Sequence, residues 1–563
     1  MIAVLINWII IFVFASIFGG GALVIAGIMT QKEVLWGKWD NVLVTGIIFL
    51  TVYAQFFSIF YKVSAACCAC LCLLSIPFLA LLIYKKNYKK VFPVIHWTNS
   101  QWILLFLFVL LIMIWTSLRP EHYDTTVYHA QAIRWIEKYG VVPGLGNLHN
   151  RFAYNSAFMV LQALFSFKWE LDQSLHAMNG FLAVLFVFYV VDSFSWKKEA
   201  MASDLLKAVI IWYIVLNAFK ISSPSSDIPT LLFVLWVNAK WLECIEREEE
   251  ELLQYIFLCV ASVFTVTLKL SAVSCILLIV YPLIVLVKRK QWKGIAVSTL
   301  VCLMVALPFF IRNVIISGYL IYPYPQIDLF NFEWKMPASV LEHDAKEICV
   351  WGRTTYEVSR YQETIFTWFP IWWQSLSHSY RMLFLISMFS VLFMIIYMIN
   401  AFIKKEVKFS MATLMLSEIC GMLIWIFGAP LPRYGWINMI ILPCTAFSLA
   451  VKRSYIRRYI YLLRNVVMIG ILFYGLSRKD GTTDLDAVMQ QDYKNGAVRE
   501  VDFEGLCIYL PDGDDRTGYD PFPSILYQEQ LDNIELRGDD FDSGFRIKAE
   551  KKGLHLRNDG YEW

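Results

Sequence analysis

Charge is scarce in this sequence. Only 17% of the 563 residues are Asp, Glu, Lys or Arg, whereas 58% are apolar and the mean hydropathy is +0.54. A water-soluble domain of ordinary size has no interior large enough for so many apolar side chains. The composition therefore excludes a soluble protein and predicts that lipid solvates much of the surface.

An excess of either sign of charge is also missing. The 49 Lys and Arg residues are nearly balanced by 46 Asp and Glu, so the net charge is +3. The basic residues stand mostly in short clusters between apolar blocks, not along one surface as binding to nucleic acid requires. We therefore expect no nucleic-acid partner.

The sequence contains instead a series of apolar blocks of about 16 to 25 residues, the length of a helix that crosses a bilayer. Continuous blocks of this kind cross as α-helices. The first block lacks a preceding basic segment and is too long for a cleaved signal peptide, so we expect it to stay in the mature protein. The predicted fold class is an all-α polytopic membrane protein. Its roughly fourteen transmembrane helices are placed at residues 5–29, 42–60, 63–84, 101–117, 173–193, 204–220, 227–243, 254–269, 270–288, 294–311, 381–402, 409–428, 434–451 and 457–476.

Basic residues in short loops indicate the orientation, because Lys and Arg remain on the cytoplasmic side. The basic clusters fall on one side when the spans alternate, which places both termini on the outer side. The same alternation predicts outer segments at residues 118–172, 222–227, 312–380 and 430–434. The clusters are Lys85-Lys86-Asn87-Tyr88-Lys89-Lys90, Lys197-Lys198, Lys288-Arg289-Lys290, Lys404-Lys405 and Lys452-Arg453.

Residues 478–563 differ sharply in composition from the transmembrane domain, residues 1–477. They are rich in Asp, Gly and Arg and contain no apolar run of span length. Alternating pieces at 506–510 and 545–547 predict strands, and residues 511–514 predict a turn. We expect a small extracytoplasmic domain of α/β or mostly β structure that does not carry the catalytic centre, because its acids lie in turn-like segments.

Cysteine is nearly confined to the predicted spans and their ends, where it behaves as a small hydrophobic residue. Of the 12 cysteines, only Cys349 and Cys507 are assigned to outer segments. Their placement allows two alternatives, an intrachain disulfide or two free thiols.

The first outer loop contains the strongest candidate for chemistry, Asp124. Residues 126–139 have the pattern of an amphipathic helix lying at the membrane surface, and Asp124 directly precedes it. One interpretation is that Asp124 only caps this helix. The other is that it is a functional acid, because a turn-rich stretch and a second amphipathic segment at 152–168 predict a roofed cavity above it.

Other predicted outer segments supply charges that complement this acid. Asp227 and Lys269 stand at span ends, and Arg312 and Arg433 stand at the outer membrane edge. An acid facing several cations at headgroup depth suits a phosphate-bearing lipid and a hydroxyl to be deprotonated. The alternative for Lys269 and Arg312 is that they extend from a helix end toward water.

The loop also resembles a known family. The residues that carry the likeness are Tyr123-Asp124-Thr125 through Arg134-Trp135-Ile136, then Gly144-Leu145-Gly146-Asn147-Leu148-His149 and Arg151. Together with two interfacial helices and a multi-span body, they are similar to the C-type fold class of glycosyltransferases (GT-C), which includes protein O-mannosyltransferases and aminoarabinose transferases. The resemblance covers roughly residues 100–450 and is most specific in the first loop.

The resemblance implies an inverting transfer of a sugar from a polyprenyl-phosphate donor to a hydroxyl of a glycan, lipid or protein acceptor, at the outer face of a bacterial cell (inner) membrane. Asp124 matches the general base of the family and Arg433 a donor-phosphate contact. Many members carry two adjacent acids, whereas here Thr125 follows Asp124, so Glu121 is the alternative base. No cofactor is implied, and a divalent metal remains open. The further substrate-binding candidates are Tyr128, His129, His149, Arg151, Asp227, Lys269, Arg312 and Tyr434.

Several motifs have two interpretations. His129 and His149 suit either a metal or ordinary loop hydrogen bonds, and their wide spacing favours the latter. The aromatic run 368–373 is typical of an interfacial belt, with sugar stacking as the alternative. Gly144-Leu145-Gly146 is not a phosphate loop, because no strand precedes it and no Lys-Ser/Thr follows.

Two other function classes stay open. A polysaccharide polymerase or ligase also handles lipid-linked sugars at outer basic loops. A flippase or transporter requires ionisable or Gly/Pro-interrupted spans near the bilayer midplane, and the sequence shows few of these because most charges cluster at span ends.

Overall fold

The structure is a computed structural model that describes residues 1–30, 38–194, 201–248, 251–450 and 485–551, together with 466, 468–471 and 474. The predicted basic clusters Lys197-Lys198 and Lys452-Arg453 lie outside the described residues, as does most of the predicted span 457–476.

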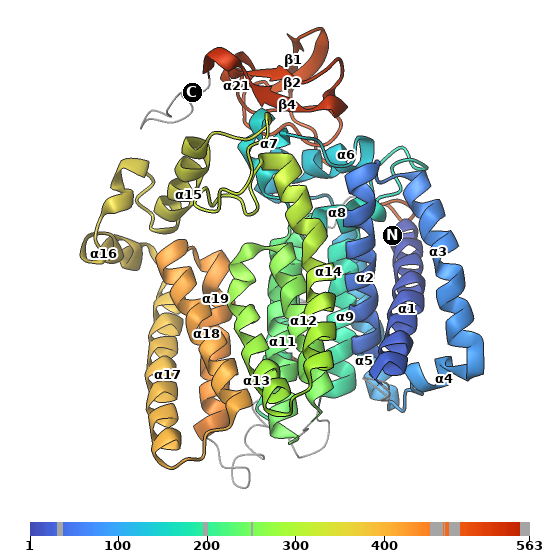
Figure 1. The fold of residues 1–563 in the computed structure, drawn as a ribbon, viewed down its shortest axis with the longest axis vertical. Helices are drawn as coiled ribbons and strands as arrows, with labels where there is room; N and C mark the ends of the chain where they lie inside the picture. The colour runs from blue at the N-terminus through green and yellow to red at the C-terminus, as the bar shows by residue number, and fades with distance from the viewer. Residues whose placement is uncertain are drawn as a thin grey trace.

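The chain forms a helical bundle capped at one end by loops and short strands (Figure 1). Within the described ranges, nine helical segments are long and apolar enough to cross a membrane, which confirms a helical polytopic membrane protein. They are α1 (Ile2–Thr30), α2 (Trp39–Phe60), α3 (Ala65–Ile83), α5 (Asn99–Ser117), α11 (Asp227–Glu246), the continuous stretch Leu270–Lys288, α14 (Trp292–Ser317), α17 (His378–Ile403) and α18 (Phe409–Gly428).

The predicted number of about fourteen spans is not confirmed. Four predicted spans correspond to helices outside this set, and α10 is only 14 residues long. The stretch Leu270–Lys288 is also not one regular helix, because it consists of a 3₁₀ segment followed by a short α-helix. The four helices are α9 (Met178–Ser193), α10 (Ser203–Leu216), α12 (Leu252–Leu268) and α19 (Pro432–Ala450). The two parts of the stretch Leu270–Lys288 are η5 (Leu270–Ile279) and α13 (Val280–Lys288).

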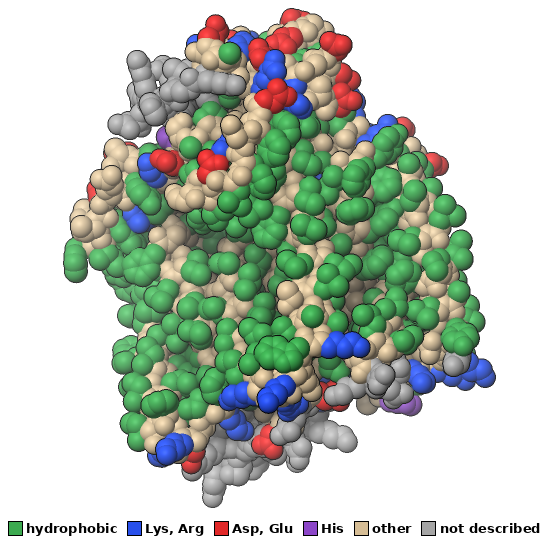
Figure 2. Space-filling view, viewed as in Figure 1, with side chains coloured by type: hydrophobic (Ala, Val, Ile, Leu, Met, Phe, Trp, Pro, Cys, Tyr) green, Lys and Arg blue, Asp and Glu red, His purple; other side chains and the backbone are tan. Residues whose placement is uncertain are grey.

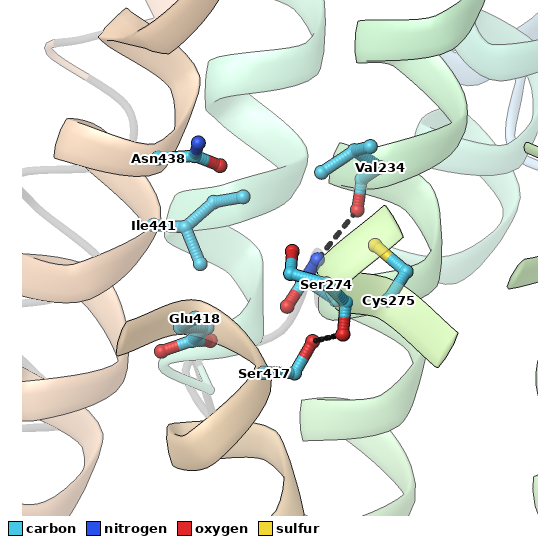
Figure 3. A pocket seen from close by; sticks show the side chains of 8 residues that line it. Val234, Ser274, Cys275, Ser417, Glu418, Asn438 and Ile441 are labelled. Carbon is cyan, nitrogen blue, oxygen red and sulfur yellow. Dashed lines mark hydrogen bonds between the residues drawn. The ribbon is translucent and has the colours of Figure 1, made fainter. Parts of the chain in front are cut away.

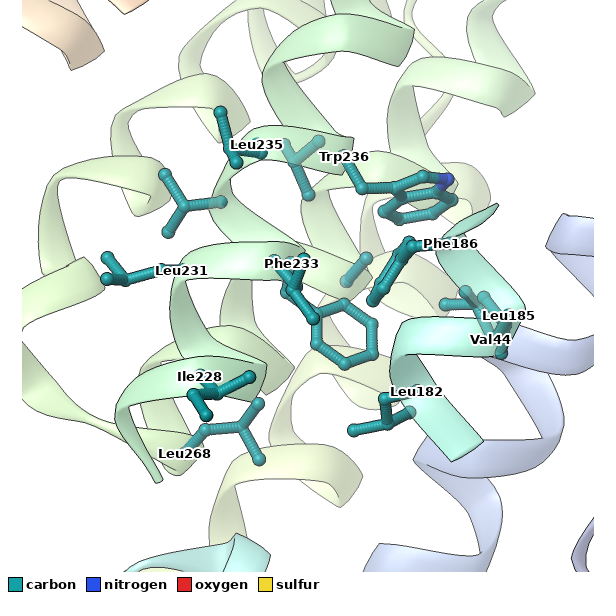
Figure 4. Close-up of a cluster of buried hydrophobic side chains, with 14 of the residues drawn as sticks. Val44, Leu182, Leu185, Phe186, Ile228, Leu231, Phe233, Leu235, Trp236 and Leu268 are labelled. Carbon is teal, nitrogen blue, oxygen red and sulfur yellow. The ribbon is translucent and has the colours of Figure 1, made fainter. Parts of the chain in front are cut away.

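Helix α11 lies at the centre of the bundle. It is apolar around most of its circumference, as a core helix requires, and its apolar window is completely buried. Figure 4 shows Phe233 and Trp236 of α11 against Phe186 of α9, and the Phe186 and Phe233 rings meet edge to face at 5.0 Å. The position of α11 matters because both of its ends carry charged residues.

Helices α1 and α2 cross unusually closely, and glycine makes this possible. A Cβ atom at Gly46 would lie 2.0 Å from the carbonyl oxygen of Ala15, and one at Gly19 would lie 1.9 Å from that of Val42. Small residues that let two backbones approach are typical of helix packing in membranes.

One end of the bundle carries the basic turns. The turns between α3 and α5, between α13 and α14 and between α17 and α18 lie at the same end (Figure 1), and Figure 2 shows Lys and Arg gathered along that rim. We call this end the basic face. The positive-inside rule predicts that it faces the cytoplasm.

The opposite end, here called the loop face, carries residues 118–172, the α15–α16 segment and the C-terminal strands (Figure 1). Its helices are α6 (Ala130–Lys138), α7 (Leu145–Leu148), α8 (Ala157–Leu164), α15 (Ala338–Gly352), α16 (Ile365–Ser375) and α21 (Glu529–Asn533). Two antiparallel pairs of strands lie above α6 and α7 (Figure 1), β1 (Val498–Phe503) with β2 (Leu506–Pro511) and β3 (Ile534–Leu536) with β4 (Phe545–Ile547). The strands predicted at 506–510 and 545–547 are therefore confirmed.

The C-terminal strands share one hydrophobic core with the loops. Trp135 of α6 packs against Phe541 and Phe545, and the core continues through residues of α7 and the 316–341 segment. The Gln131 amide nitrogen donates to the carbonyls of Gly518 and Pro521 at 3.0 and 2.8 Å. Residues 485–551 thus form the roof of the loop face.

One expectation about the loop face is wrong, and one open alternative is decided. The segment predicted as amphipathic at 152–168 contains α8, which is buried on every side among the spans and so cannot lie at an interface. Cys349 and Cys507 do not pair: Cys349 is buried in α15 with its thiol directed at the Phe427 carbonyl, whereas Cys507 is exposed on β2.

The aromatic run 368–373 lies in α16. Trp368 and Trp372 are buried, and the Trp372 indole donates to the Pro430 carbonyl at 2.7 Å, whereas Phe366 is 88% exposed. A short helix with one packed face and one bare aromatic face suits the membrane interface, in keeping with the aromatic-belt interpretation.

Candidate functional site

Asp124 does not cap the helix that follows it. Its backbone is already helical (φ −60°, ψ −21°), and its side chain accepts no capping hydrogen bond. The N-cap interpretation is therefore wrong. The carboxylate instead faces Arg433, with its Oδ2 3.6 Å from Arg433 Nη1 and 4.0 Å from His122 Nδ1.

The backbone after Asp124 is wider than an α-helix. Residues Thr125–His129 form one turn of π-helix before α6 continues the chain. Such turns are rare and occur frequently at functional sites. The turn places the His129 ring beside His122, with centroids 6.1 Å apart, and beside Tyr128 at 4.3 Å.

Arg433 is the second residue of α19. Its guanidinium donates to the Tyr434 hydroxyl at 2.7 Å and lies 4.8 Å from the centre of the Tyr434 ring. About half of the Arg433 side chain is exposed (48%), compared with 16% for Asp124. The guanidinium thus remains accessible to an additional anion while it contacts Asp124.

A second acid and a second cation complete the group. Lys269, which follows α12 in extended conformation, contacts the carboxylate of Asp227 at the start of α11. The Lys269 ammonium also lies 4.2 Å from the centre of the Tyr434 ring. A narrow pocket adjoins this pair, lined by Asp227, Thr230, Leu231, Lys269, Ser271 and Tyr434.

We call His122, Asp124, Asp227, Lys269, Arg433 and Tyr434 the acid–base cluster. Burial lowers the pKa of His122, and this effect exceeds the opposite effect of the Asp124 and Asp227 carboxylates. Burial also lowers the pKa of His129 to about 3. Both imidazoles are then neutral near pH 7, so two carboxylates face two cations and the cluster has no net charge of its own.

A second buried acid lies at the loop face. Asp344 of α15 accepts hydrogen bonds from the hydroxyls of Tyr154 and Tyr322, the latter at 3.0 Å, and from the Asn150 amide at 3.1 Å. Burial raises the pKa of Asp344 to about 6, although the tyrosine hydrogen bonds lower it. Sequence analysis missed this residue. The available signal was its spacing from Val340 and Leu341, which places an acid on the buried face of α15.

The predicted loop residues divide between these two acids. His149 is buried and its Nδ1 lies 3.0 Å from Asn150 Oδ1, which places it in the Asp344 group. The Arg151 guanidinium lies 5.8 Å from the centre of the Tyr128 ring, and its charge acts on both Tyr128 and Asp344. Tyr128 and Arg151 therefore lie between the acid–base cluster and Asp344.

Two predicted residues are not part of the cluster. Glu121 is exposed and, in the part of the chain that the structure describes, forms no ion pair. Arg312 is only 2% exposed and donates to the Ser58 hydroxyl at 2.5 Å and to Asn155 Oδ1 at 3.1 Å. It therefore neither extends toward water nor reaches the cluster. Lys269, for which the same alternative was open, contacts Asp227 and belongs to the cluster.

The metal alternative for the histidines finds no ligand set. Across the described ranges, no group of three or more His, Cys, Asp and Glu side chains is arranged to hold a metal ion. His129 contacts Thr125 and Tyr128, whereas His149 contacts Asn150.

The bundle and this cluster define a helical, multi-spanning membrane protein with a polar site at one end. More specifically, the chain belongs to the family described as Domain of unknown function (DUF8201), whose model matches residues 1–440. The match includes the whole acid–base cluster and ends before the C-terminal strands. Comparisons with curated proteins and with solved structures gave no match.

Proposed function

We propose that this protein is an integral membrane glycosyltransferase that transfers a sugar from a polyprenyl-phosphate donor to an acceptor hydroxyl. The observation that carries the proposal is the contact of Asp124 with Arg433 beside the Asp227–Lys269 pair, at the end of the bundle where a lipid headgroup would lie. A general base and two cations are what this reaction needs from side chains.

In the proposed step, Asp124 accepts the proton of the acceptor hydroxyl. The hydroxyl oxygen forms a bond with the anomeric carbon, and the bond from that carbon to the phosphate oxygen breaks with inversion. Arg433 and Lys269 stabilise the charge that develops on the departing polyprenyl phosphate. The proton remains on Asp124 until solvent removes it.

Asp124 suits the base better than the other acids nearby. Asp227 is already in contact with Lys269, so its carboxylate is stabilised in the ionised form and is less basic. The Asp124–Arg433 separation of 3.6 Å is longer than a direct hydrogen bond, and an acceptor hydroxyl can therefore compete for the carboxylate.

The basic face supports a location in a bacterial cell membrane with the cluster on the extracytoplasmic side, where such lipid donors are used. In intact cells, a membrane-impermeant thiol reagent should label a cysteine introduced at Glu121 and not one introduced at Asn87. Labelling at Asn87 from outside would contradict this orientation.

The proposal is tested by incubating the purified full-length protein with a panel of polyprenyl-phosphate sugars and candidate acceptors. We expect one donor to release polyprenyl phosphate with formation of a glycosylated product. Failure of every donor, with intact protein, would contradict the proposal.

A transporter of lipid-linked glycans is a second candidate. The observation that favours it is Glu418, an acid buried within span α18, since ionisable groups inside spans often mark transport pathways. Movement of an intact lipid-linked glycan across proteoliposomes, without release of polyprenyl phosphate, would favour this candidate.

A further inference from the structure

A polar cavity lies inside the bundle, separate from the pocket at Asp227. It is formed where α11, η5, α18 and α19 meet, as Figure 3 shows. Its free volume is about 10 Å³, enough for one group the size of a water molecule or a bare ion, and it is lined by Val234, Asn238, Ser274, Cys275, Ser417, Glu418, Asn438 and Ile441.

Among the described residues, two buried oxygen atoms of this cavity have no hydrogen-bond partner. Glu418 is 6% exposed; its Oε1 accepts from the Thr445 hydroxyl at 2.7 Å, whereas its Oε2 has no partner. Asn238 is 3% exposed; its amide nitrogen donates to the Val234 carbonyl at 2.7 Å, whereas its Oδ1 has no partner. When Glu418 is ionised, both unsatisfied atoms are acceptors, so the ligand that satisfies them is a donor or a cation.

The described residues supply no positive charge here. The residues that line the cavity include no Lys, Arg or His, and Glu418 forms no ion pair within the described residues. An ionised carboxylate inside a span is costly unless it is paired. A bound cation would satisfy Glu418 and Asn238 together.

Further oxygen atoms are available around the same cavity. The hydroxyls of Ser274 and Ser417 and the amide of Asn438 line it, and the Ser417 hydroxyl donates to the Ser274 carbonyl at 2.8 Å (Figure 3). Ser274 belongs to η5, a ten-residue 3₁₀ segment within a span. Interrupted helices of this kind supply cation ligands in membranes.

We propose that this cavity binds a monovalent alkali cation, with Glu418 as its only charged ligand. One carboxylate and one monovalent cation give a neutral site, whereas a divalent ion would leave a positive charge inside the span. The Asn238 oxygen and the neighbouring hydroxyl and amide oxygens provide the hard ligands that such an ion prefers.

The site adjoins the acid–base cluster through shared elements. The pocket at Asp227 is lined by Thr230 of α11, Ser271 of η5 and Tyr434 of α19, about one helical turn nearer the loop face than the residues of this cavity. A cation bound between these elements would fix the spacing of α11 and α19, which carry Asp227 and Arg433. Binding of the cation does not depend on the proposed transferase activity.

The test is thermal unfolding of the purified full-length protein in detergent, titrated with NaCl or KCl while choline chloride keeps the ionic strength constant. We expect saturable stabilisation by Na⁺ or K⁺, and the comparison of the two identifies the preferred ion. Equal thermal stability in choline chloride alone, or a stability that depends on pH and not on Na⁺ or K⁺, would overturn the proposal. Glu418 would then be a protonated carboxyl group without a bound cation.

Variants separate binding at this cavity from general salt effects. Glu418→Gln should abolish the saturable response, and Ser274→Ala should weaken the apparent affinity by about tenfold. The matched control is Glu406→Gln, which removes an exposed acid at the basic face and should leave the response unchanged. If Glu418→Gln does not fold, the affinity of Ser274→Ala and direct binding of radioactive Na⁺ to the wild type still test whether the cavity binds a cation. An unchanged affinity in Ser274→Ala, or retained binding in folded Glu418→Gln, would overturn the site.

Discussion

The central helix α11 has a group of charges at each end, and the two groups are satisfied in different ways. Near the basic face, Lys240 of α11 contacts Asp40 of α2, and Lys207 of α10 lies 3.3 Å from Asp204 and 3.4 Å from Glu243. All five side chains are at most 6% exposed. At the loop face, Arg433 is half exposed and lies 3.6 Å from Asp124, and the closely paired Lys269 and Asp227 are 30% and 20% exposed.

This difference separates charges that hold the bundle together from charges that can bind a ligand. Buried, closely paired charges leave no room for another group, and removing one partner leaves the other uncompensated. A half-exposed cation at longer distance from its acid can exchange that acid for a phosphate or a hydroxyl. Substitutions at the two ends of α11 should therefore have different consequences.

The largest effect should come from Asp124→Asn. Loss of a general base typically costs about 10² to 10⁴ in rate, so the variant should bind donor lipid but release polyprenyl phosphate at a rate lower by that factor. Glu121→Gln is the matched control and should retain activity, because Glu121 is exposed and outside the cluster. Near-normal turnover of Asp124→Asn, with loss in Glu121→Gln, would move the base to Glu121.

A substitution at the basic-face end of α11 should change the stability of the protein. Lys240→Ala leaves Asp40 buried without its cation, and we expect the free energy of unfolding to fall by about 3–5 kcal/mol, measured by thermal or denaturant unfolding in detergent. Lys404→Ala removes an exposed lysine at the same face and should change stability by less than about 0.5 kcal/mol. Equal stability of the two variants would remove the distinction between the ends of the helix.

Sequence alone gave a good account of the long spans and a poor one of the short or irregular segments. The span predicted at 409–428 coincides with α18, because a continuous apolar block of this length has one physical outcome in a membrane. The segment at 270–288 is equally apolar, yet its first ten residues form a 3₁₀ helix. Composition indicates how apolar a segment is, but it does not indicate whether the segment forms an α-helix or a 3₁₀ helix.

The same limit applies to the site. The loop sequence and the family resemblance identified Asp124 as a candidate, and the structure places its carboxylate 3.6 Å from Arg433. Asp344 was missed because its burial depends on Tyr154 and Tyr322, which come from other segments. Glu418 was passed over although a single acid inside an apolar block is by itself a reason to suspect function.

A third prediction uses the pH dependence of Asp344. Its pKa of about 6 lies above the ordinary unfolded value of about 3.9, so the folded state binds the proton more tightly. The stabilisation is therefore fully present below about pH 4 and is lost as the pH rises through about 6. Asp344→Asn should remove this loss of about 2 kcal/mol, seen as a flatter curve of stability between pH 4 and 7. A parallel curve would show that Asp344 does not titrate there.

The smallest effect should come from Arg433→Gln, which sharpens the comparison because it changes ligand binding without changing the fold. The guanidinium is half exposed, so its ion pair with Asp124 contributes little to stability, and the unfolding temperature should stay within the range of the exposed control Arg516→Gln. Loss of a charged hydrogen bond to a donor phosphate is worth roughly 1.5–3 kcal/mol, and we therefore expect donor affinity to fall by at least about tenfold. Titration of a fluorescent polyprenyl-phosphate sugar measures that affinity.

Arg516→Gln removes a cation of the C-terminal roof that pairs with Asp514, and its donor affinity should equal that of the wild type. A large loss of stability in Arg433→Gln would place Arg433 with the structural charges of the basic face, and equal losses of donor affinity in both variants would show that Arg433 makes no specific contact with the phosphate.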